Sequence, residues 1–594
     1  MKIKSLFPIF FMMLHMQQSS ALQKGDSLSA ILPEDTFLTI ELDNLTDIKS
    51  DMSAGPWGKV ADFPIWQKIS KWIDEELNKE SNKKDKLNNV YERLFQPMMD
   101  SLNGAMIFGF SDLENLMVNE QIENANGSKW KAQKMPFTAS VFESSLSEEG
   151  FQEMISFLKT WKTKKKSRFS VIEDKIGKVK IFWVFLQKNE GLEKLNPKST
   201  GFCLSLNNGK LYFLTGDVER VESIFERQKG SEVSLLNNNT YIDCFDEIGR
   251  GNARMFINFN QAIHTLQKMR KEKEFEIPQN PFGINMDGLI KGLGLDELEF
   301  LGLQLNCQDE NFELSSFLGL SERNGILSLL APVDGDLEFH NFVSEDVFSL
   351  SNARQDLFEI WPRFEKILKD VSPGLHLLVT SQIQAFEDQA EVAVRDDLLG
   401  SLGSEFISLS YLNEANLGTV AEVSPSSAIY AIGLKDPQLF DRTMRAVLDS
   451  VSQGNELFQD REHRGVTIRS MRGLEGVGLS LSYAIANDWL LLSMGKARYM
   501  NQVINKMEDN KNSLWSASFM KDALDDLPSG IRQTDYIDFR ELFSFFQMMS
   551  DAVKDNDFKF SSEDFGEFPY FMFGWSKDID LGIVSKVRLY PFKN

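Results

Sequence analysis

The chain has 594 residues, of which 42% are hydrophobic and 25% are charged, and its net charge is −23. This length exceeds what a single hydrophobic core supports, so we expect more than one core. The acidic balance argues against nucleic-acid binding, because such a surface repels a phosphate backbone.

The N-terminal segment has the pattern of a secretory signal peptide. Lys2 and Lys4 precede a short apolar run at residues 6–14, and small residues lead to Ala21. This pattern predicts a signal peptide at 1–21 that is cleaved after Ala21. The apolar run is too short to span a bilayer, which takes about 20 residues. We therefore expect a soluble mature chain without a transmembrane anchor, in the periplasm or secreted outside the cell.

The elements of the first half alternate between strand and helix. Residues 38–42 alternate apolar and polar side chains, which is the period of a strand. Apolar residues between 57 and 73 recur at helical spacing, and residues 105–110 form a further apolar strand. Next come a strand at 140–142 and an amphipathic helix that carries Phe151.

The following segment contains a hairpin. Residues 181–186 are apolar on both faces, which predicts a central strand. An Asn-Gly turn at 208–209 separates two short apolar runs and favours a hairpin. Residues 298–305 and 312–320 predict another hairpin. Because hairpins pair antiparallel strands, we predict an α+β fold, with a mostly antiparallel or mixed sheet and helices packed on one face.

The second half repeats the first. Residues 243–248 resemble 522–527, and Ile257-Asn258-Phe259 resembles Ile537-Asp538-Phe539. The segment 33–37 resembles 344–348, and the matches keep the same order along the chain. The repetition predicts an internal duplication, with two similar tandem domains at 22–335 and 336–594.

Some features are shared by the two copies and others are not. Two polar inserts, 119–136 and 188–200, and a basic run at 162–168 occur only in the first copy. We expect shared residues to form the cores, and function to lie in unshared residues or in the groove between the copies. The expected core pairs are Phe151 with Phe440, Leu214 with Leu492, Phe259 with Phe539, and Met269 with Met549.

Four short segments resemble those of a family of large exported bacterial proteins of unknown function. They are residues 33–36, 55–59, 396–403 and 487–493. The resemblance covers most of the mature chain and implies a signal peptide and repeated strand–helix units. It implies no catalytic residue.

Cysteine and histidine do not form a recognisable site in the sequence. The three cysteines, Cys203, Cys244 and Cys307, are widely spaced and unrepeated, which favours buried thiols over disulfides or metal ligands. No two histidines of the mature chain have a metal-ligand spacing. These histidines are His264, His340, His376 and His463. We therefore assign no catalytic, cofactor-binding or metal-binding residue, and no cofactor.

Other motifs also favour structural roles. Gly55 and Gly58 lack the spacing of a phosphate loop and favour a turn into a helix. The Asp-x-Asp-x-Gly sequence at 578–582 lacks the glutamate that completes a calcium loop, and a β-turn explains it better. Asp396-Asp397 is the most visible acidic pair in the sequence. Residues 238–240 form a glycosylation sequon.

These observations favour a non-enzymatic envelope protein that binds or scaffolds an unknown protein or ligand of the cell envelope, and not nucleic acid. One alternative is a carrier of an apolar ligand in a sheet–helix cavity, suggested by the 47 phenylalanines. The other is a hydrolase with dispersed carboxylates, since paired acids that meet only in space leave no spacing rule.

Overall fold

The computed structural model describes most of the chain from residue 28 onward. The residues outside the description are 1–27, 69–70, 72–95, 114–118, 124–128, 134–135, 161–168, 187–200, 272–279, 308–311, 413–425, 453–456, 474–480, 510–511, 545–561 and 594. The predicted signal peptide, the basic run and the second polar insert therefore lie outside the described residues.

The chain divides into two compact units. The first comprises Met1–Asp62, Trp66–Phe275 and Glu299–Gly319. The second comprises Phe63–Ile65, Glu276–Leu298 and Leu320–Asn594. The segment Glu276–Leu298 precedes the division predicted at residue 335 and yet belongs to the second unit.

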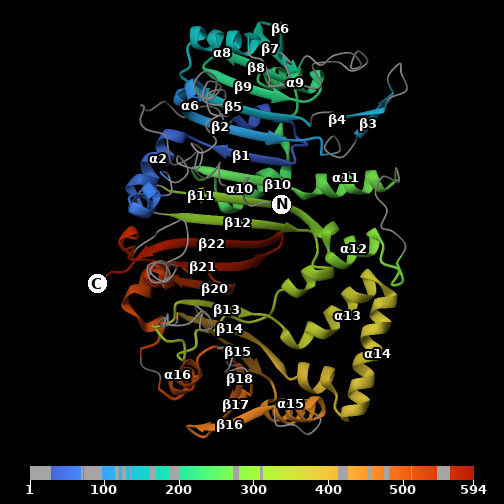
Figure 1. Cartoon of the computed structure of the whole chain (residues 1–594), viewed down its shortest axis with the longest axis vertical. Coiled ribbons are helices and arrows are strands. Elements are labelled where there is room, and N and C mark those ends of the chain that lie inside the picture. The colour runs from blue at the N-terminus through green and yellow to red at the C-terminus, as the bar shows by residue number, and fades with distance from the viewer. Residues whose placement is uncertain are drawn as a thin grey trace. The chain divides into compact units, whose positions relative to one another are not determined.

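The first unit contains an antiparallel sheet (Figure 1). Its hydrogen-bonded neighbours run in the order β6-β7-β8-β9-β5-β2-β1-β10-β11. β12 packs beside β11, where the ring centroids of Phe300 and Phe317 are 4.8 Å apart. The strands are β1 (Leu38–Leu42), β2 (Leu102–Phe110), β5 (Thr138–Ser144), β6 (Phe169–Ile176), β7 (Val179–Leu186), β8 (Phe202–Asn207), β9 (Lys210–Thr215), β10 (Ala253–Asn258), β11 (Leu298–Asn306) and β12 (Glu313–Leu320).

The second unit contains an antiparallel sheet with the same order of strands. Its neighbours run β16-β17-β18-β19-β15-β14-β13-β20-β21-β22. Each strand thus has a counterpart in the first unit, from β1 with β13 to β12 with β22. The strands are β13 (Ser349–Arg354), β14 (Leu402–Leu412), β15 (Ser426–Leu434), β16 (Phe458–His463), β17 (Val466–Met471), β18 (Leu481–Ala486), β19 (Trp489–Met494), β20 (Ile531–Asp538), β21 (Tyr570–Ile579) and β22 (Gly582–Pro591).

The turns fix the register between the two units. Asn208 and Asn487 both adopt a left-handed conformation, with φ of 51° and 53°, in the equivalent β8–β9 and β18–β19 hairpins. Superposing these turns matches Leu214 with Ser493, so the predicted match with Leu492 is wrong by one residue. The side chains of Leu214 and Ser493 are both buried.

The other expected core pairs have mixed outcomes. Phe151 and Phe440 are buried, as predicted. Phe259 and Phe539 are only half-buried, and each directly follows the last residue of a strand. The side chains of Met269 and Met549 lie outside the described part of the structure.

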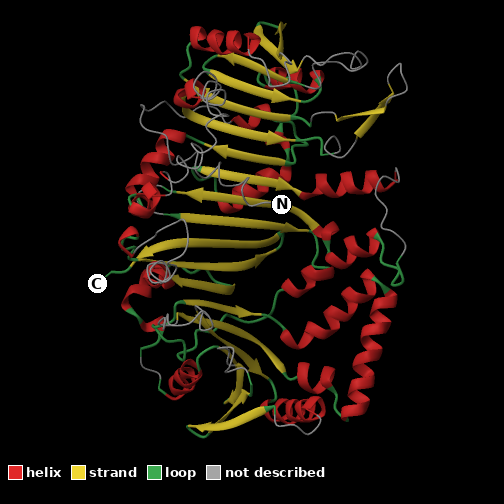
Figure 2. Cartoon of the chain, in the orientation of Figure 1, coloured by secondary structure: helices red, strands yellow, loops and turns green. Residues whose placement is uncertain are grey.

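Helices flank the strands of the first sheet (Figure 2), and they contact both of its faces. α8 (Glu148–Thr160) packs on the face that carries Leu211, whereas Phe225 of α9 (Val218–Arg227) packs on Tyr212, with ring centroids 5.1 Å apart. Consecutive strand residues point to opposite faces. The prediction that helices pack on one face is therefore wrong, because α8 covers the second face of strands that are apolar on both sides.

The second unit has the same arrangement. α15 (Pro437–Ser452) packs with Leu490, whereas α16 (Ala497–Glu508) packs with Leu491. The other α-helices of the described residues are α2 (Leu45–Ala54), α3 (Pro56–Ala61), α6 (Gln96–Ser101), α10 (Asn239–Ile248), α11 (Phe259–Lys271), α12 (Met286–Leu293), α13 (Ile360–Val371), α14 (Pro373–Ala390) and α17 (Lys521–Asp525). Among the described residues, no helix has the length and apolar character needed to cross a bilayer.

The first polar insert contains a small ladder of its own. β3 (Asn119–Glu123) pairs antiparallel with β4 (Lys129–Gln133), apart from the main sheet. The three cysteines are buried thiols, as predicted.

Candidate metal centre

Two donor residues lie on an irregular segment of the second unit that precedes β13. Glu338 is exposed and His340 is half-buried, and both are held through their backbone. Asn352 Nδ2 donates a hydrogen bond to the Glu338 carbonyl at 2.8 Å, and Trp515 Nε1 donates one to the His340 carbonyl at 3.1 Å. These bonds fix the path of the segment on which the two side chains stand.

A third donor comes from β14. Glu405 lies opposite Arg354 in the β13–β14 ladder, beside the irregularity between Leu402 and Phe406. Gly433 on the neighbouring strand β15 has no side chain, and a Cβ there would stand 3.5 Å from Glu405 Cβ. The carboxylate of Glu405 reaches the segment that carries His340.

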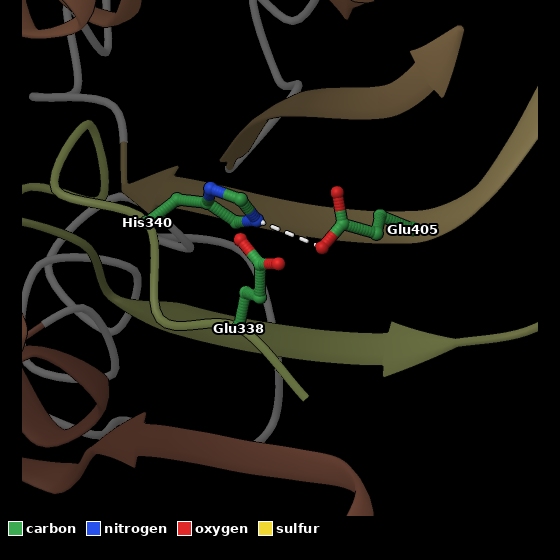
Figure 3. Close-up of side chains that lie close together, drawn as sticks. All are labelled: Glu338, His340 and Glu405. Carbon is green, nitrogen blue, oxygen red and sulfur yellow. Dashed lines mark hydrogen bonds and ion pairs between the residues drawn. The ribbon is translucent and has the colours of Figure 1, made fainter. Parts of the chain in front are cut away.

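The three side chains converge (Figure 3). His340 Nε2 lies 3.2 Å from Glu405 Oε1, and one ligand atom from each of the three residues lies within 4.8 Å of the others. The side chains of His340 and Glu405 are 19% and 24% exposed, so solvent reaches the cluster. One imidazole nitrogen and two carboxylates thus surround a point that a cation could occupy.

Aromatic rings hold the imidazole in place. The His340 ring stacks on Phe342, with centroids 5.5 Å apart, and forms a T-shaped contact with Trp489, with centroids 4.8 Å apart. A ring fixed on two sides keeps Nε2 directed at Glu405. This positioning favours ligand binding over a role that needs the ring to swing.

The charges in the cluster are coupled. The hydrogen bond with His340 lowers the pKa of Glu405; burial opposes this shift, while the charges of His340 and Arg354 add to it. Glu405 is therefore a carboxylate at neutral pH. A second carboxylate, Glu338, lies beside it, so the site attracts positive charge.

The sequence pattern did not identify this cluster. Glu-x-His places two donors two residues apart, and this spacing is a detectable local signal wherever the backbone is extended. Glu405, however, follows 65 residues later on another strand. Only the pairing of β13 with β14 brings it to the other two side chains.

The other histidines lie elsewhere. His376 on α14 contacts Glu365 on α13 at 3.1 Å, and His463 contacts Asn505 at 2.9 Å. His264 is exposed on α11. None of these side chains joins the Glu338 cluster.

The remaining sequence motifs have structural roles. Asp578 lies on β21 at the start of the hairpin turn to β22, as predicted, and pairs with Arg323 at 2.6 Å and Arg532 at 3.2 Å. Asn238 of the sequon caps α10 by accepting a hydrogen bond from Tyr241 N. Asp396 is exposed on a short helical turn that precedes β14.

The first unit holds a different polar cluster, which is closed. Glu41 on β1 is 3% exposed and accepts hydrogen bonds from Arg254 Nε, Tyr241 and Ser29. Burial raises the pKa of Glu41, with Arg254 opposing the shift, and burial raises the pKa of Tyr241 to about 12. A shifted acid can mark an active site, but this one is covered by its own partners. We interpret it as a structural ion pair.

The comparisons with known proteins add little. No protein-family model matches the sequence, and no curated protein matches it. Among solved structures, crystal form III of TP0453 is 10% identical, covers 52% of this chain and 84% of that chain, and has a TM-score of 0.23. Crystal form I of TP0453 is also 10% identical, covers 52% and 82%, and has a TM-score of 0.22. Similarity this low carries no argument about fold or function.

Proposed function

We propose that this chain is an exported envelope protein that acts by binding or scaffolding and not by catalysis. The convergence of Glu338, His340 and Glu405 carries the proposal. Ring contacts fix the imidazole, and its Nε2 and the Glu405 carboxylate face one shared point, an arrangement suited to holding a cation. A general base would need that nitrogen to be directed at a substrate or nucleophile.

We also propose that the chain arose by internal duplication. The identical order of strands in the two units supports this, as does the shared geometry of the Asn208 and Asn487 turns. A duplicated frame supplies a rigid support, and residues present in one unit only can then take up function. Glu405 illustrates this, because its counterpart on β2 is Ala105.

The proposed location outside the cytoplasm can be tested directly. The basic start, the apolar run and Ala21 support export with cleavage after Ala21. Protein from the extracytoplasmic fraction should begin at Leu22 on N-terminal sequencing. Recovery of a chain that keeps Met1 in the cytosol would contradict export.

The binding function is tested by native mass spectrometry of the protein purified from its own host. We expect a mass above that of the polypeptide, from a retained partner or ligand. Mild unfolding should release it, and its mass would distinguish a protein, a lipid or a metal ion. A polypeptide that carries nothing and turns over an envelope substrate would contradict the proposal.

A further inference from the structure

We propose that Glu338, His340 and Glu405 bind one Zn²⁺ ion. This inference names a ligand for the binding function proposed above and rests on it. It concerns residues of the second unit only.

The spacing of the donors suits zinc. With Zn–N and Zn–O bonds of about 2.0–2.1 Å, two ligands of a tetrahedral site lie roughly 3.3 Å apart. His340 Nε2 and Glu405 Oε1 are 3.2 Å apart. The third donor lies within 4.8 Å of both and belongs to Glu338, whose exposed side chain is free to rotate inward. Binding therefore needs the movement of a single side chain.

The chemistry of the donors also favours zinc over Mg²⁺ and Ca²⁺. Mg²⁺ and Ca²⁺ prefer sites made entirely of oxygen, whereas an imidazole nitrogen with carboxylates suits zinc and related transition metals. Three protein ligands leave one position for water or an exogenous ligand. Cu²⁺ should also bind, because it exceeds Zn²⁺ in affinity at most nitrogen and oxygen sites.

The local charge favours a cation. Arg354 supplies a nearby positive charge: it lies opposite Glu405 and donates a hydrogen bond to the Asp334 carbonyl at 3.0 Å. One guanidinium against two carboxylates leaves the group negative when the imidazole is neutral. A zinc ion would offset this charge and relieve the repulsion between Glu338 and Glu405.

The competing explanation is a simple histidine–glutamate ion pair, and the chain contains one for comparison. His376 and Glu365 lie 3.1 Å apart, with side chains 20% and 39% exposed. Among the described residues, no third carboxylate or thiol joins them in a three-donor group. His376→Asn is therefore a matched control for His340→Asn.

The test is equilibrium dialysis of the purified whole chain against Zn²⁺, with Mg²⁺ as the contrasting ion. We expect one Zn²⁺ per chain and no comparable uptake of Mg²⁺. Glu338→Gln and His340→Asn should each weaken zinc binding by more than about tenfold, because even outer partners of a metal site contribute 10–100-fold. His376→Asn should leave the affinity unchanged.

Three results would overturn the proposal: no zinc uptake by the unaltered chain, unchanged affinity in Glu338→Gln, or equal losses in His340→Asn and His376→Asn. Glu338 is exposed, so its variant decides the question if His340→Asn does not fold, as judged by circular dichroism. Failure here would leave the export and partner-capture experiments unaffected. A chain that binds zinc but stays in the cytosol would contradict only the envelope function.

Discussion

The two units differ in the polar side chains at equivalent buried positions of β1 and β13, the first main-sheet strand of each unit in chain order. In the first unit, Glu41 on β1 lies opposite Arg254 on β10. In the second unit, Asn352 on β13 lies opposite Thr534 on β20. The backbone around them is the same: Leu235 N donates to the Leu32 carbonyl at 2.8 Å, and Leu514 N donates to the Val343 carbonyl at 2.9 Å.

The difference shows that one arrangement of strands can hold either a buried or a solvent-accessible polar cluster. A buried ion pair costs desolvation, which only complete hydrogen bonding offsets, and Glu41 has that set of partners. The second unit has neutral side chains at the buried positions. In that unit, the ionisable side chains of Glu338, His340 and Glu405 form a partly exposed cluster near β13. At the equivalent buried positions, the first unit therefore holds an ion pair and the second holds neutral side chains, while the Glu338 cluster of the second unit is accessible to solvent.

The largest expected effect is that of Arg254→Met. It leaves the Glu41 carboxylate buried without its cation, which typically costs about 3–5 kcal/mol. Urea unfolding of the first unit should shift accordingly. The cysteines all belong to that unit, so their alkylation during a urea titration reports its unfolding separately from that of the second unit.

The double variant Glu41→Asn with Arg254→Thr copies the second unit and serves as the control. We expect it to recover most of the stability lost in Arg254→Met, because no buried charge remains. A double variant that is less stable than Arg254→Met would show that neutral side chains cannot replace the ion pair.

Phe151 and Phe440 allow a second comparison. Phe151→Ala should cost about 3–5 kcal/mol, since α8 packs Phe151, Ile155 and Leu158 as fully buried residues. Phe440→Ala should cost less, because most of its neighbours on α15 are only partly buried. Urea titrations of both variants measure this difference, and equal losses would mean that the two helix contacts are equivalent.

The pH dependence should also distinguish the units. Burial raises the pKa of Glu41 above its ordinary value of 4.5, despite Arg254, so the folded chain takes up a proton more readily than the unfolded chain. The stability of the first unit relative to Glu41→Gln should therefore fall as the pH rises from 4.5 through the raised pKa. A difference between the two chains that does not change with pH would contradict this.

The smallest effect concerns the native thiols. Burial raises the pKa of Cys244 to about 12 and that of Cys307 to about 11, so little thiolate forms at pH 8. Alkylation of the native chain should be slow, and alkylation after denaturation should modify three sites. Rapid labelling of one thiol in the native chain would show that its surroundings open locally.

Local patterns in the sequence determined much of the fold. Alternation at 38–42 predicted β1, and the Asn-Gly turn predicted the β8–β9 hairpin, because strand period and turn preference act over a few residues. The repeat of residues 243–248 and 257–259 predicted a second unit of similar architecture. The α+β class followed from these hairpins and the amphipathic helices between them.

The tertiary structure alone decided where polar residues meet. Glu405 joins His340 across 65 residues, and Glu41 meets Tyr241 across 200, because strand pairing and helix packing close these distances. No periodicity marks such pairs, since a contact between distant residues leaves no local spacing. The prediction that helices pack on one face of the sheet failed for the same reason. Apolar residues on both sides of a strand indicate that both faces are buried, but only the tertiary packing shows that α8 covers one face and α9 the other.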